Sequence, residues 1–433
     1  MSRTIETQMP VNITSRTLFS LAICLTIFAV PSAADNPWSS FHGADLAGYV
    51  QNGKLPNSWS ESDYRWTHEL GSHDVGSPVV VGDKVFLLAS KPSSAELSIV
   101  ALRLTDGTSI WEKTYPHPDH HLHSRNTFAS STPACDDNNV FIAFSSPKHT
   151  YLKCLDHSGN EVWSRDFGSW QSQHGFGTSP RIVGNMIIML NSQQSEQLKD
   201  GKKPGQSRMI AVDRKTGKTI WETPLATARS CYGVPGVYRS ENGTQIIGAN
   251  MGNGLFGLDI ATGKMLWSKK VFAMRCCSTP VIAGDIAIGS SGSGGGGNHL
   301  VAVKIPSATT TQPKQIYRVD RGAPYVPTPA LKDKMLFTVS DKGGIVSCID
   351  SQSGKSHWSK RVGGNFGASP IVVGDKLLVI SLSGIATILS ASSDYKELGE
   401  VELGGPVGAT PAYTNEQLIL RVGEQLRCLD VSK

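Results

Sequence analysis

The sequence predicts an all-β fold, an eight-bladed β-propeller with four-stranded antiparallel blades. Two repeating patterns lead to this prediction: a proline that recurs once per unit, and a glycine–tryptophan spacing that recurs between these prolines. The composition agrees with it, because 44 of the 433 residues are glycine, 23 are proline and only 18% are charged. Such a composition is typical of many short strands joined by tight turns.

Each unit begins at a proline that in most units follows a small residue. After most of these prolines comes a β-branched run, a Gly-Asp or similar turn, and a second apolar run; residues 79–86 and 371–378 are near copies of this pattern. Two apolar runs around a glycine turn form a hairpin. The eight prolines, spaced 41 to 55 residues apart, are Pro78, Pro133, Pro180, Pro235, Pro280, Pro329, Pro370 and Pro411.

The second half of most units carries a glycine and a tryptophan four residues apart, as in Gly217 and Trp221. This pattern predicts a second hairpin, which gives each unit the four strands of a propeller blade. A blade cannot bury both of its faces alone, so we expect the tryptophan to pack on the neighbouring blade. The predicted docking residues are Trp66, Trp111, Trp163, Trp221, Trp267 and Trp358.

The two ends of the chain predict how the ring closes. The eighth unit, from Thr410, offers three strands before Lys433. We expect residues 64–70 to add the fourth strand, because this pairs both open edges. The predicted organisation is a secretory signal peptide (1–34), a leader that packs on the propeller (35–62) and the eight-bladed propeller (63–433).

The signal peptide is predicted from three features in sequence order. Arg3 and Arg16 precede an apolar stretch over residues 18–30, and small residues follow up to Ala34. An apolar stretch of this length suits a cleaved secretory signal better than a membrane span, although an uncleaved anchor is the alternative. We therefore expect an exported protein, periplasmic or secreted, that does not span the membrane.

The net charge of +5 is spread along the chain rather than gathered into basic runs. A nucleic-acid partner needs a concentrated cationic face, so we expect none. Seven cysteines follow the predicted signal peptide, an odd number that leaves at least one thiol unpaired within a single chain. Which of them pair stays open at this point.

The Asp-x-x-Thr-Gly-Lys turns that lead to the tryptophans, as at Asp213 and Asp259, resemble the repeats of pyrroloquinoline quinone (PQQ) dehydrogenases and of the outer-membrane assembly protein BamB. The stretch 38–43 is similar to the leader of exported BamB-like repeat proteins. The resemblance covers residues 38–433 and implies the propeller fold. It leaves the function open, because one ring hosts several functions.

Loops that lead into the prolines are expected to surround one end of the central channel, where propellers often bind ligands. Arginines and histidines in these loops would suit an anionic ligand or a partner surface; the alternative is that they are solvated loop residues. The candidates for this rim are His73, Arg125, His174, Arg229, Tyr232, Arg275, Cys276, Cys277, Arg321 and Tyr325.

A second group of candidates is the histidine run before the second blade. Histidines at close spacing can bind a transition metal, but the flanking prolines favour an exposed polar loop. These weaker metal candidates are His117, His120, His121 and His123.

Two functions follow from these expectations. The favoured one is a non-catalytic, BamB-like scaffold, a monomeric ring that binds a protein partner at the cell envelope or an extracellular polymer, with no cofactor. The alternative is a PQQ-dependent dehydrogenase that uses calcium, in which Cys276 and Cys277 would form the vicinal disulfide that the resemblance implies. The calcium ligands and catalytic aspartate of such enzymes match no motif here, and we assign no catalytic residue.

Overall fold

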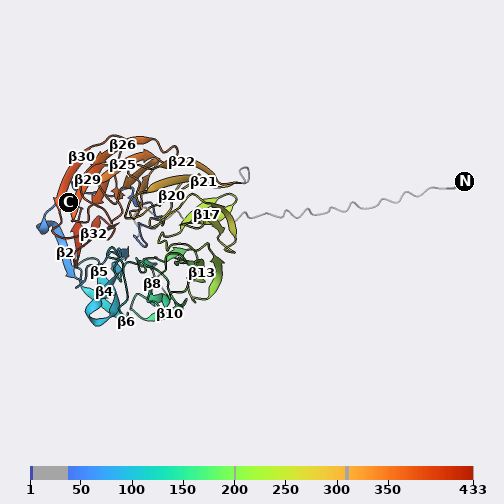
Figure 1. The fold of residues 1–433 in the computed structure, drawn as a ribbon, viewed down its shortest axis with the longest axis horizontal. Helices are drawn as coiled ribbons and strands as arrows, with labels where there is room; N and C mark the ends of the chain where they lie inside the picture. Colours follow the sequence, from blue (N-terminus) through green and yellow to red (C-terminus); the bar gives the residue numbers. More distant parts are fainter. Residues whose placement is uncertain (3–37, 199–200, 308–311, 433) are drawn as a thin grey trace. The chain divides into compact units, whose positions relative to one another are not determined.

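The computed structural model describes residues 1–2, 38–198, 201–307 and 312–432. Contacts divide the chain into two units, Met1–Asp35 and Asn36–Lys433, and the described strands all belong to the second (Figure 1). Apart from Met1 and Ser2, the predicted signal peptide lies outside the described residues. Among the described residues, no helix has the length and apolar character that a membrane span requires.

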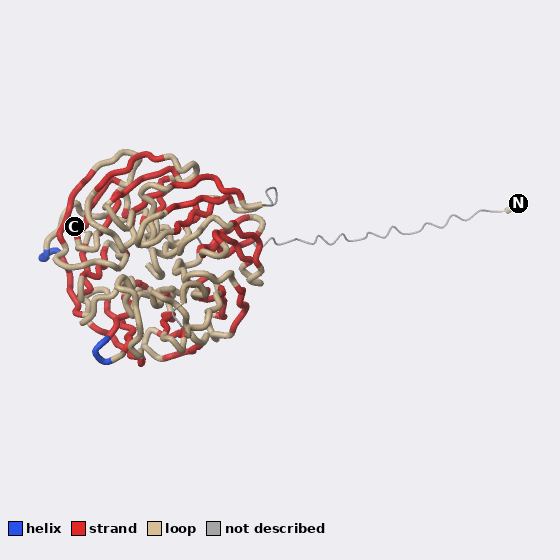
Figure 2. Tube along the Cα trace, in the orientation of Figure 1, coloured by secondary structure: helices blue, strands red, loops and turns tan. Residues whose placement is uncertain are grey.

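The described strands form eight sheets, each built on a four-stranded antiparallel meander, and β1 adds a fifth, parallel strand to one of them. The sheets follow one another around a ring, as the colours of Figure 1 show, and the tube in Figure 2 shows loops gathered toward the middle of the ring. The predicted eight-bladed β-propeller is therefore confirmed.

Blades 1 to 4 contain only strands that are consecutive in sequence. Blade 1 consists of β3 (Val79–Val81), β4 (Lys84–Lys91), β5 (Glu96–Arg103) and β6 (Ser109–Pro116); blade 2 of β7 (Ala134–Cys135), β8 (Asn139–Ser145), β9 (Thr150–Asp156) and β10 (Glu161–Asp166); blade 3 of β11 (Arg181–Val183), β12 (Met186–Asn191), β13 (Arg208–Asp213) and β14 (Thr219–Pro224); and blade 4 of β15 (Gly236–Ser240), β16 (Gly243–Asn250), β17 (Gly254–Asp259) and β18 (Met265–Lys269).

Blades 5 and 6 again contain only consecutive strands, whereas blades 7 and 8 each include a strand from the N-terminal part of the chain. Blade 5 consists of β19 (Val281–Ala283), β20 (Ile286–Ser291), β21 (His299–Lys304) and β22 (Lys314–Val319); blade 6 of β23 (Ala330–Lys332), β24 (Met335–Val339), β25 (Ile345–Asp350) and β26 (Ser356–Arg361); blade 7 of β1 (Tyr49–Val50), β27 (Ile371–Val373), β28 (Lys376–Ile380), β29 (Ile385–Ser390) and β30 (Glu397–Glu402); and blade 8 of β31 (Ala412–Thr414), β32 (Gln417–Val422), β33 (Gln425–Asp430) and β2 (Tyr64–Glu69).

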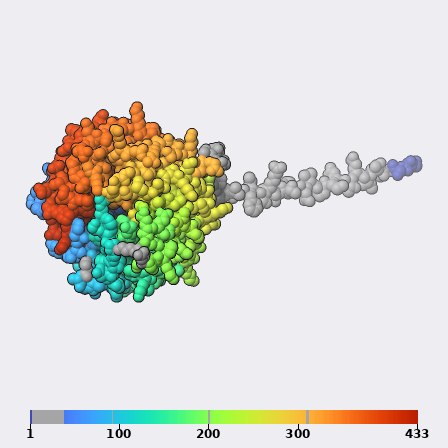
Figure 3. All heavy atoms as spheres, viewed as in Figure 1, coloured from blue at the N-terminus to red at the C-terminus, as the bar shows by residue number. Residues whose placement is uncertain are grey.

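The ring closes where β2 pairs antiparallel with β33, with Trp66 opposite Cys428. The N-terminal strand thus becomes the outer strand of the last blade, as the sequence predicts. The space-filling view shows the same closure, because atoms coloured for the start and the end of the chain lie side by side (Figure 3). Two single-turn 3-10 helices, η1 (Glu61–Asp63) and η2 (Pro92–Ser94), complete the described secondary structure.

The outer strand of every blade contains a β-bulge, which explains the glycine–tryptophan spacing. In blade 2 the bulged residue is Val162, directly before Trp163, and the other seven blades have the same irregularity at the equivalent place. The Trp163 indole N–H donates to the Arg214 carbonyl of blade 3 at 2.9 Å. Gly217 lies against this indole with φ +67°, and a Cβ there would approach the ring to 2.7 Å. The turn therefore needs glycine both for its backbone angle and for the space.

The same indole-to-carbonyl contact with the next blade recurs around the ring. Trp66, Trp111, Trp221 and Trp358 each donate to a carbonyl of the next blade, those of Leu104, His157, Ile260 and Ser392. In blade 5 the hydroxyl of Tyr317 takes this role. Trp267 differs: it packs in the cluster between blades 4 and 5, but its N–H donates to Gln245 of its own blade.

Residues 38–55, which precede the ring, cross the central channel. The carbonyls of Trp38, Ser39 and Ala47 accept hydrogen bonds from the innermost strands of blades 1, 2 and 6, and β1 pairs in parallel with β27 of blade 7. Lys54 then reaches Glu416 and Tyr413 near the hairpin turn of blade 8. We call the side of these short hairpin turns the turn side, and the opposite side, where the lead-in loops lie, the loop face. The leader therefore bonds to the inner strands of several blades and ends at the turn side, opposite to the loop face.

Candidate functional site

Basic side chains from the lead-in loops of blades 2 to 5 come together on the loop face. His123 of blade 2 stacks on His174 of blade 3, with ring centroids 4.3 Å apart and planes 9° apart. Arg275 of blade 5 donates from Nη2 to the side-chain oxygen of Gln173 at 3.3 Å. The Arg229 side chain of blade 4 is close enough to act electrostatically on His174. We call His123, His174, Arg229 and Arg275 the basic cluster.

Backbone and amide contacts fix the loops that carry this cluster. Asn126 donates from its side chain to the carbonyls of His174 and Phe176, at 2.6 and 3.0 Å, which ties the lead-in loop of blade 2 to that of blade 3. The Arg275 carbonyl accepts from the backbone N–H of Gly292 at 3.0 Å. The basic side chains therefore extend from constrained backbone.

Several donors of the basic cluster are buried without a partner among the described residues. Arg275 is only 6% exposed, and its Nε has no hydrogen-bond acceptor. The Nε of Arg229 and the Nδ1 of His174 are buried and unpartnered in the same way. A buried cation without a countercharge is costly, so this arrangement is unusual for a purely structural role.

The electrostatics of the cluster follow from burial and from its like charges. Burial, and then the charges of Arg275, His123, Arg229 and His121, lower the pKa of His174 to about 4. Burial, with Arg125 and Arg275 nearby, also lowers the pKa of His123. Both imidazoles are therefore neutral near pH 7, and the positive charge of the cluster comes from its arginines.

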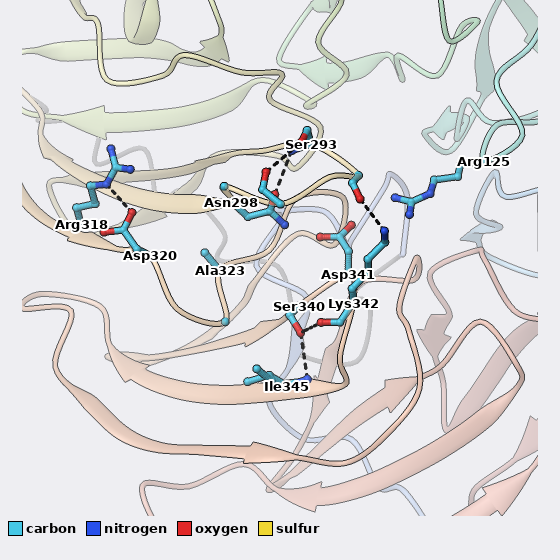
Figure 4. Close-up of a pocket in the computed structure, with 14 residues that line it drawn as sticks. Arg125, Ser293, Asn298, Arg318, Asp320, Ala323, Ser340, Asp341, Lys342 and Ile345 are labelled. Carbon is cyan, nitrogen blue, oxygen red and sulfur yellow. Dashed lines mark hydrogen bonds and ion pairs between the residues drawn. The ribbon is translucent and has the colours of Figure 1, made fainter.

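Arg125 extends from the lead-in loop of blade 2 across the channel mouth to a pocket at blades 5 and 6. In Figure 4 it points toward Asp341 and Lys342, from the side opposite to Arg318. Its guanidinium lies beside Gly294, where a Cβ would come within 3.2 Å of it. The glycine-rich segment 292–297 forms a hydrogen-bonded turn through Ser293, and this turn lines the pocket.

Beneath the basic cluster lie three thiols and two phenols. The backbone N–H of Cys276 donates to Sγ of Cys231 at 3.3 Å, and Tyr232 shares a hydrogen bond with Ser172 at 3.1 Å. The sulfurs of Cys231, Cys276 and Cys277 are free thiols, so Cys276 and Cys277 are not joined in the structure. Burial raises the pKa of Cys277 to about 12. Burial, and then the neighbouring Cys277 thiol, also raise the pKa of Tyr325.

The histidine run before blade 2 is not the exposed loop that its sequence suggests at every position. His117 is 3% exposed and packs edge-on against Phe128, with centroids 4.9 Å apart. His120 also packs on Phe128, and burial, then the nearby His120, lower the pKa of His117 to about 4. Across the described part of the chain, no three His, Cys, Asp or Glu side chains are grouped so as to hold a metal ion.

Two rim candidates lie apart from the basic cluster. His73 contacts the Gly423 carbonyl of blade 8 at 3.3 Å, and Arg321 is exposed on the lead-in loop of blade 6.

Sequence reasoning missed Arg421, a buried arginine within the apolar strand β32 that pairs with Asp74 at 3.0 Å. An arginine between apolar strand residues is a pattern that could have indicated it.

Comparison with models of known protein families gives one family match for this chain. The family described as "Outer membrane protein assembly factor BamB" matches residues 96–360 and, in a second match, residues 310–396. The chain belongs to this BamB family. Comparison with curated proteins gives no match.

Solved structures share the fold of this BamB family member at low sequence identity. BamB from Moraxella catarrhalis superposes with a TM-score of 0.59 at 15% identity, over 84% of this chain and 97% of that one. A europium-containing methanol dehydrogenase gives 0.60 at 13% identity, over 90% of both chains. The quinohemoprotein alcohol dehydrogenase from Comamonas testosteroni gives 0.63 at 12% identity, over 91% of this chain and 80% of that one. At these identities the likeness shows the fold alone, and the fold includes both a BamB and enzymes.

The residues of the loop face do not fit a calcium-held quinone. Calcium takes six to eight oxygen ligands, mostly from carboxylates and carbonyls. The two carboxylates at the pocket of Figure 4 have other partners: Asp341 accepts from the N–H groups of Tyr325 and Val326, and Asp320 pairs with Arg318. The arginines of the basic cluster are hydrogen-bond donors that cannot ligate a metal, and its histidines offer nitrogen where calcium takes oxygen. We therefore assign no quinone chemistry to this BamB family member.

Proposed function

We propose that this chain is a non-catalytic, exported propeller that binds a protein partner at the cell envelope through its loop face. The observation that carries the proposal is the convergence of side chains from four lead-in loops into one basic cluster on that face. The leader ends at the opposite, turn side of the ring, where Lys54 contacts blade 8. Membership of the BamB family agrees with a partner-binding role.

The chemistry of the loop face supports binding over catalysis. An efficient general base has a pKa near the working pH, whereas the pKa of His174 is lowered to about 4. A nucleophilic cysteine needs thiolate character, whereas burial raises the pKa of Cys277 to about 12. These groups are poorly suited to proton transfer or nucleophilic attack at neutral pH, while fixed guanidinium groups are well suited to recognising acidic surfaces.

A site-specific cross-linking experiment in the native cell tests the proposal. A photoreactive amino acid at Leu382, an exposed apolar residue in a loop of blade 7 on the loop face, should cross-link to one discrete protein. The matched control places the same amino acid at Lys215, in an exposed turn on the turn side. Cross-links of equal yield from both positions would contradict docking through the loop face.

A double substitution connects the cross-link to the basic cluster. The variant R229Q/R275Q should reduce the cross-link from position 382 without changing the circular dichroism spectrum of the ring. An unchanged cross-link would show that the cluster plays no part in partner binding.

The alternative enzyme is tested on purified protein. PQQ and calcium are added, and the protein is separated by gel filtration. A quinone absorbance that elutes with the protein, together with dye reduction on addition of alcohols or sugars, would overturn the non-catalytic proposal.

A further inference from the structure

In the part of the chain that the structure describes, Arg275 of the basic cluster has no carboxylate to neutralise it, whereas the comparably buried Arg421 pairs with Asp74. Its side chain is 6% exposed. The only hydrogen bond that its side chain makes to the described residues is to the neutral amide of Gln173, at 3.3 Å. Burying a charge without a countercharge costs free energy that folding must offset elsewhere. A bound anion would supply the missing countercharge and so offset this cost.

The unpartnered donors of the cluster are of the kind that binds an oxyanion. The Nε–H of Arg275 and that of Arg229 are both buried and unpartnered. In a guanidinium, Nε and one terminal nitrogen form the side-on fork that matches two oxygens of a carboxylate or phosphate. His174 adds a third buried and unpartnered nitrogen, Nδ1, which can donate when it carries the proton.

The geometry points to an oxyanion site formed by His174, Arg229 and Arg275, and we propose that it binds the carboxylate or phosphate group of a ligand. The three residues come from the lead-in loops of blades 3, 4 and 5, so the ligand would join three blades at the channel mouth. The site does not depend on the proposed protein partner: the anion comes either from a small free molecule or from an acidic side chain of a partner.

One group of the protein itself could supply the missing negative charge. Burial raises the pKa of the Cys231 thiol, but hydrogen bonds from Cys276 and Met251 and the Arg275 charge together outweigh it and lower the pKa. A thiolate at Cys231 would then pair electrostatically with Arg275, and no ligand would be required. The experiment below separates these two cases.

Thermal unfolding of the purified full chain is followed while sodium malonate or sodium phosphate is titrated at constant ionic strength, with sodium chloride as reference. The midpoint should rise saturably with at least one oxyanion and stay flat with chloride, because general screening is held constant. The substitution R275Q should weaken the apparent affinity by about tenfold or more, since it removes a charged hydrogen-bond donor. R229Q and H174Q alter half-buried side chains and give the same test if R275Q does not fold.

The matched control is R318Q. Arg318 is an exposed arginine near the same face, already paired with Asp320 at 2.8 Å, so its loss should leave the oxyanion response unchanged. An oxyanion response equal to that of chloride would overturn the proposal and favour the Cys231 thiolate. A response that persists in R275Q, R229Q and H174Q would also overturn it, because the anion would then bind elsewhere.

A competition arm identifies the source of the anion. An N-acetylated glutamate-rich peptide that displaces malonate from the wild-type chain, and not from R275Q, would indicate an acidic segment of a protein partner. Binding of malonate or phosphate without peptide competition would indicate a small free anion; both results support the site. Because all probes are added to purified protein, failure of this inference leaves the cross-linking test of the proposed function unaffected.

Discussion

Two buried arginines of the ring, Arg421 and Arg275, have opposite surroundings. Arg421 of blade 8 donates to the Asp74 carboxylate at 3.0 Å and to the carbonyls of Gly76 and Leu88 at 3.2 and 2.9 Å, and only its Nε lacks a partner. Among the described residues, the Arg275 side chain of blade 5 contacts one amide oxygen and no carboxylate. The first arginine has a carboxylate and two carbonyls as acceptors within the ring and joins blades 8 and 1. The second leaves donors unused, which is the property expected of a binding site.

The surroundings of Asp74 strengthen this contrast. Burial alone would raise the pKa of Asp74, but Arg421 and hydrogen bonds from Ser90 and Ser72 outweigh it and lower the pKa. The carboxylate therefore stays ionised and holds Arg421 in place. The difference between the two sites shows that burial of an arginine does not by itself identify a functional residue. What distinguishes the two arginines is which acceptors within the protein their guanidinium N–H groups have.

The largest expected effect comes from breaking the completed pair. R421M should destabilise the protein by about 3–5 kcal/mol, because it leaves the buried Asp74 carboxylate without its countercharge. Urea unfolding monitored by tryptophan fluorescence measures the change. The double variant D74L/R421M should recover much of the loss, and a single variant as stable as the wild type would show that the pair is dispensable.

Supplying the carboxylate that Arg275 lacks sharpens the comparison from the other side. Q173E places a carboxylate at the position that now offers an amide oxygen, and should stabilise the chain by about 1.5 kcal/mol through a charge-assisted hydrogen bond. It should also weaken binding of added malonate, since the site then carries its own anion. Unfolding in urea gives the stability, and a loss of stability in Q173E would contradict our account of Arg275.

The two sites should also respond differently to acid. The pKa of His174 is lowered to about 4, so between about pH 6.5 and 4 the unfolded chain takes up a proton that the folded chain does not, and stability falls over that range. Asp74 has a lowered pKa, so its contribution persists in this range and is lost only at lower pH.

H174Q tests this difference. Its unfolding free energy should fall by about 1 kcal/mol less than that of the wild type between pH 6.5 and 4.5, after allowance for solvent access to a half-buried ring. The residual pH dependence reports other histidines such as His117. Parallel pH profiles for H174Q and wild type would contradict the lowered pKa.

The smallest effect is expected for R275M in the absence of ligand. Removing a buried charge that has no countercharge should leave stability unchanged or raise it by up to about 1 kcal/mol. The measurement is the same urea titration as for R421M, in buffer without oxyanions. A loss as large as that of R421M would show that Arg275 is structural and would remove the difference between the two sites.

The sequence predicts the ring well because a propeller repeats a local pattern. Prolines such as Pro78 and Pro370 and glycine–tryptophan pairs such as Gly217 and Trp221 indicate each blade within one window of sequence, and the missing fourth strand of the last unit indicates closure by residues 64–70. Sheet pairing confirms these predictions.

The candidate site is less predictable because it depends on contacts between loops of different blades. Sequence reasoning selects Arg229, Arg275 and His174 as rim residues, but their shared lack of partners appears only once the loops are placed. It cannot indicate that Arg125 crosses the channel mouth to Gly294. The pair of Asp74 and Arg421 joins residues 347 positions apart, and no repeat links them.

The path of the leader has a consequence for how the chain matures. Carbonyls at residues 38–48 accept hydrogen bonds from blades that are synthesised at opposite ends of the chain, such as Val80 and Val372, and β2 pairs only with the final strand. Until the last strands are synthesised, the early blades therefore lack part of their pairing partners: β2 has no strand to pair with, and the leader lacks its contacts with the later blades. Contacts of such long sequence separation make assembly slow and leave partly made rings prone to aggregation. Loss of the C-terminal strand alone should keep the nascent chain from reaching a protease-resistant state, however intact its first seven blades are.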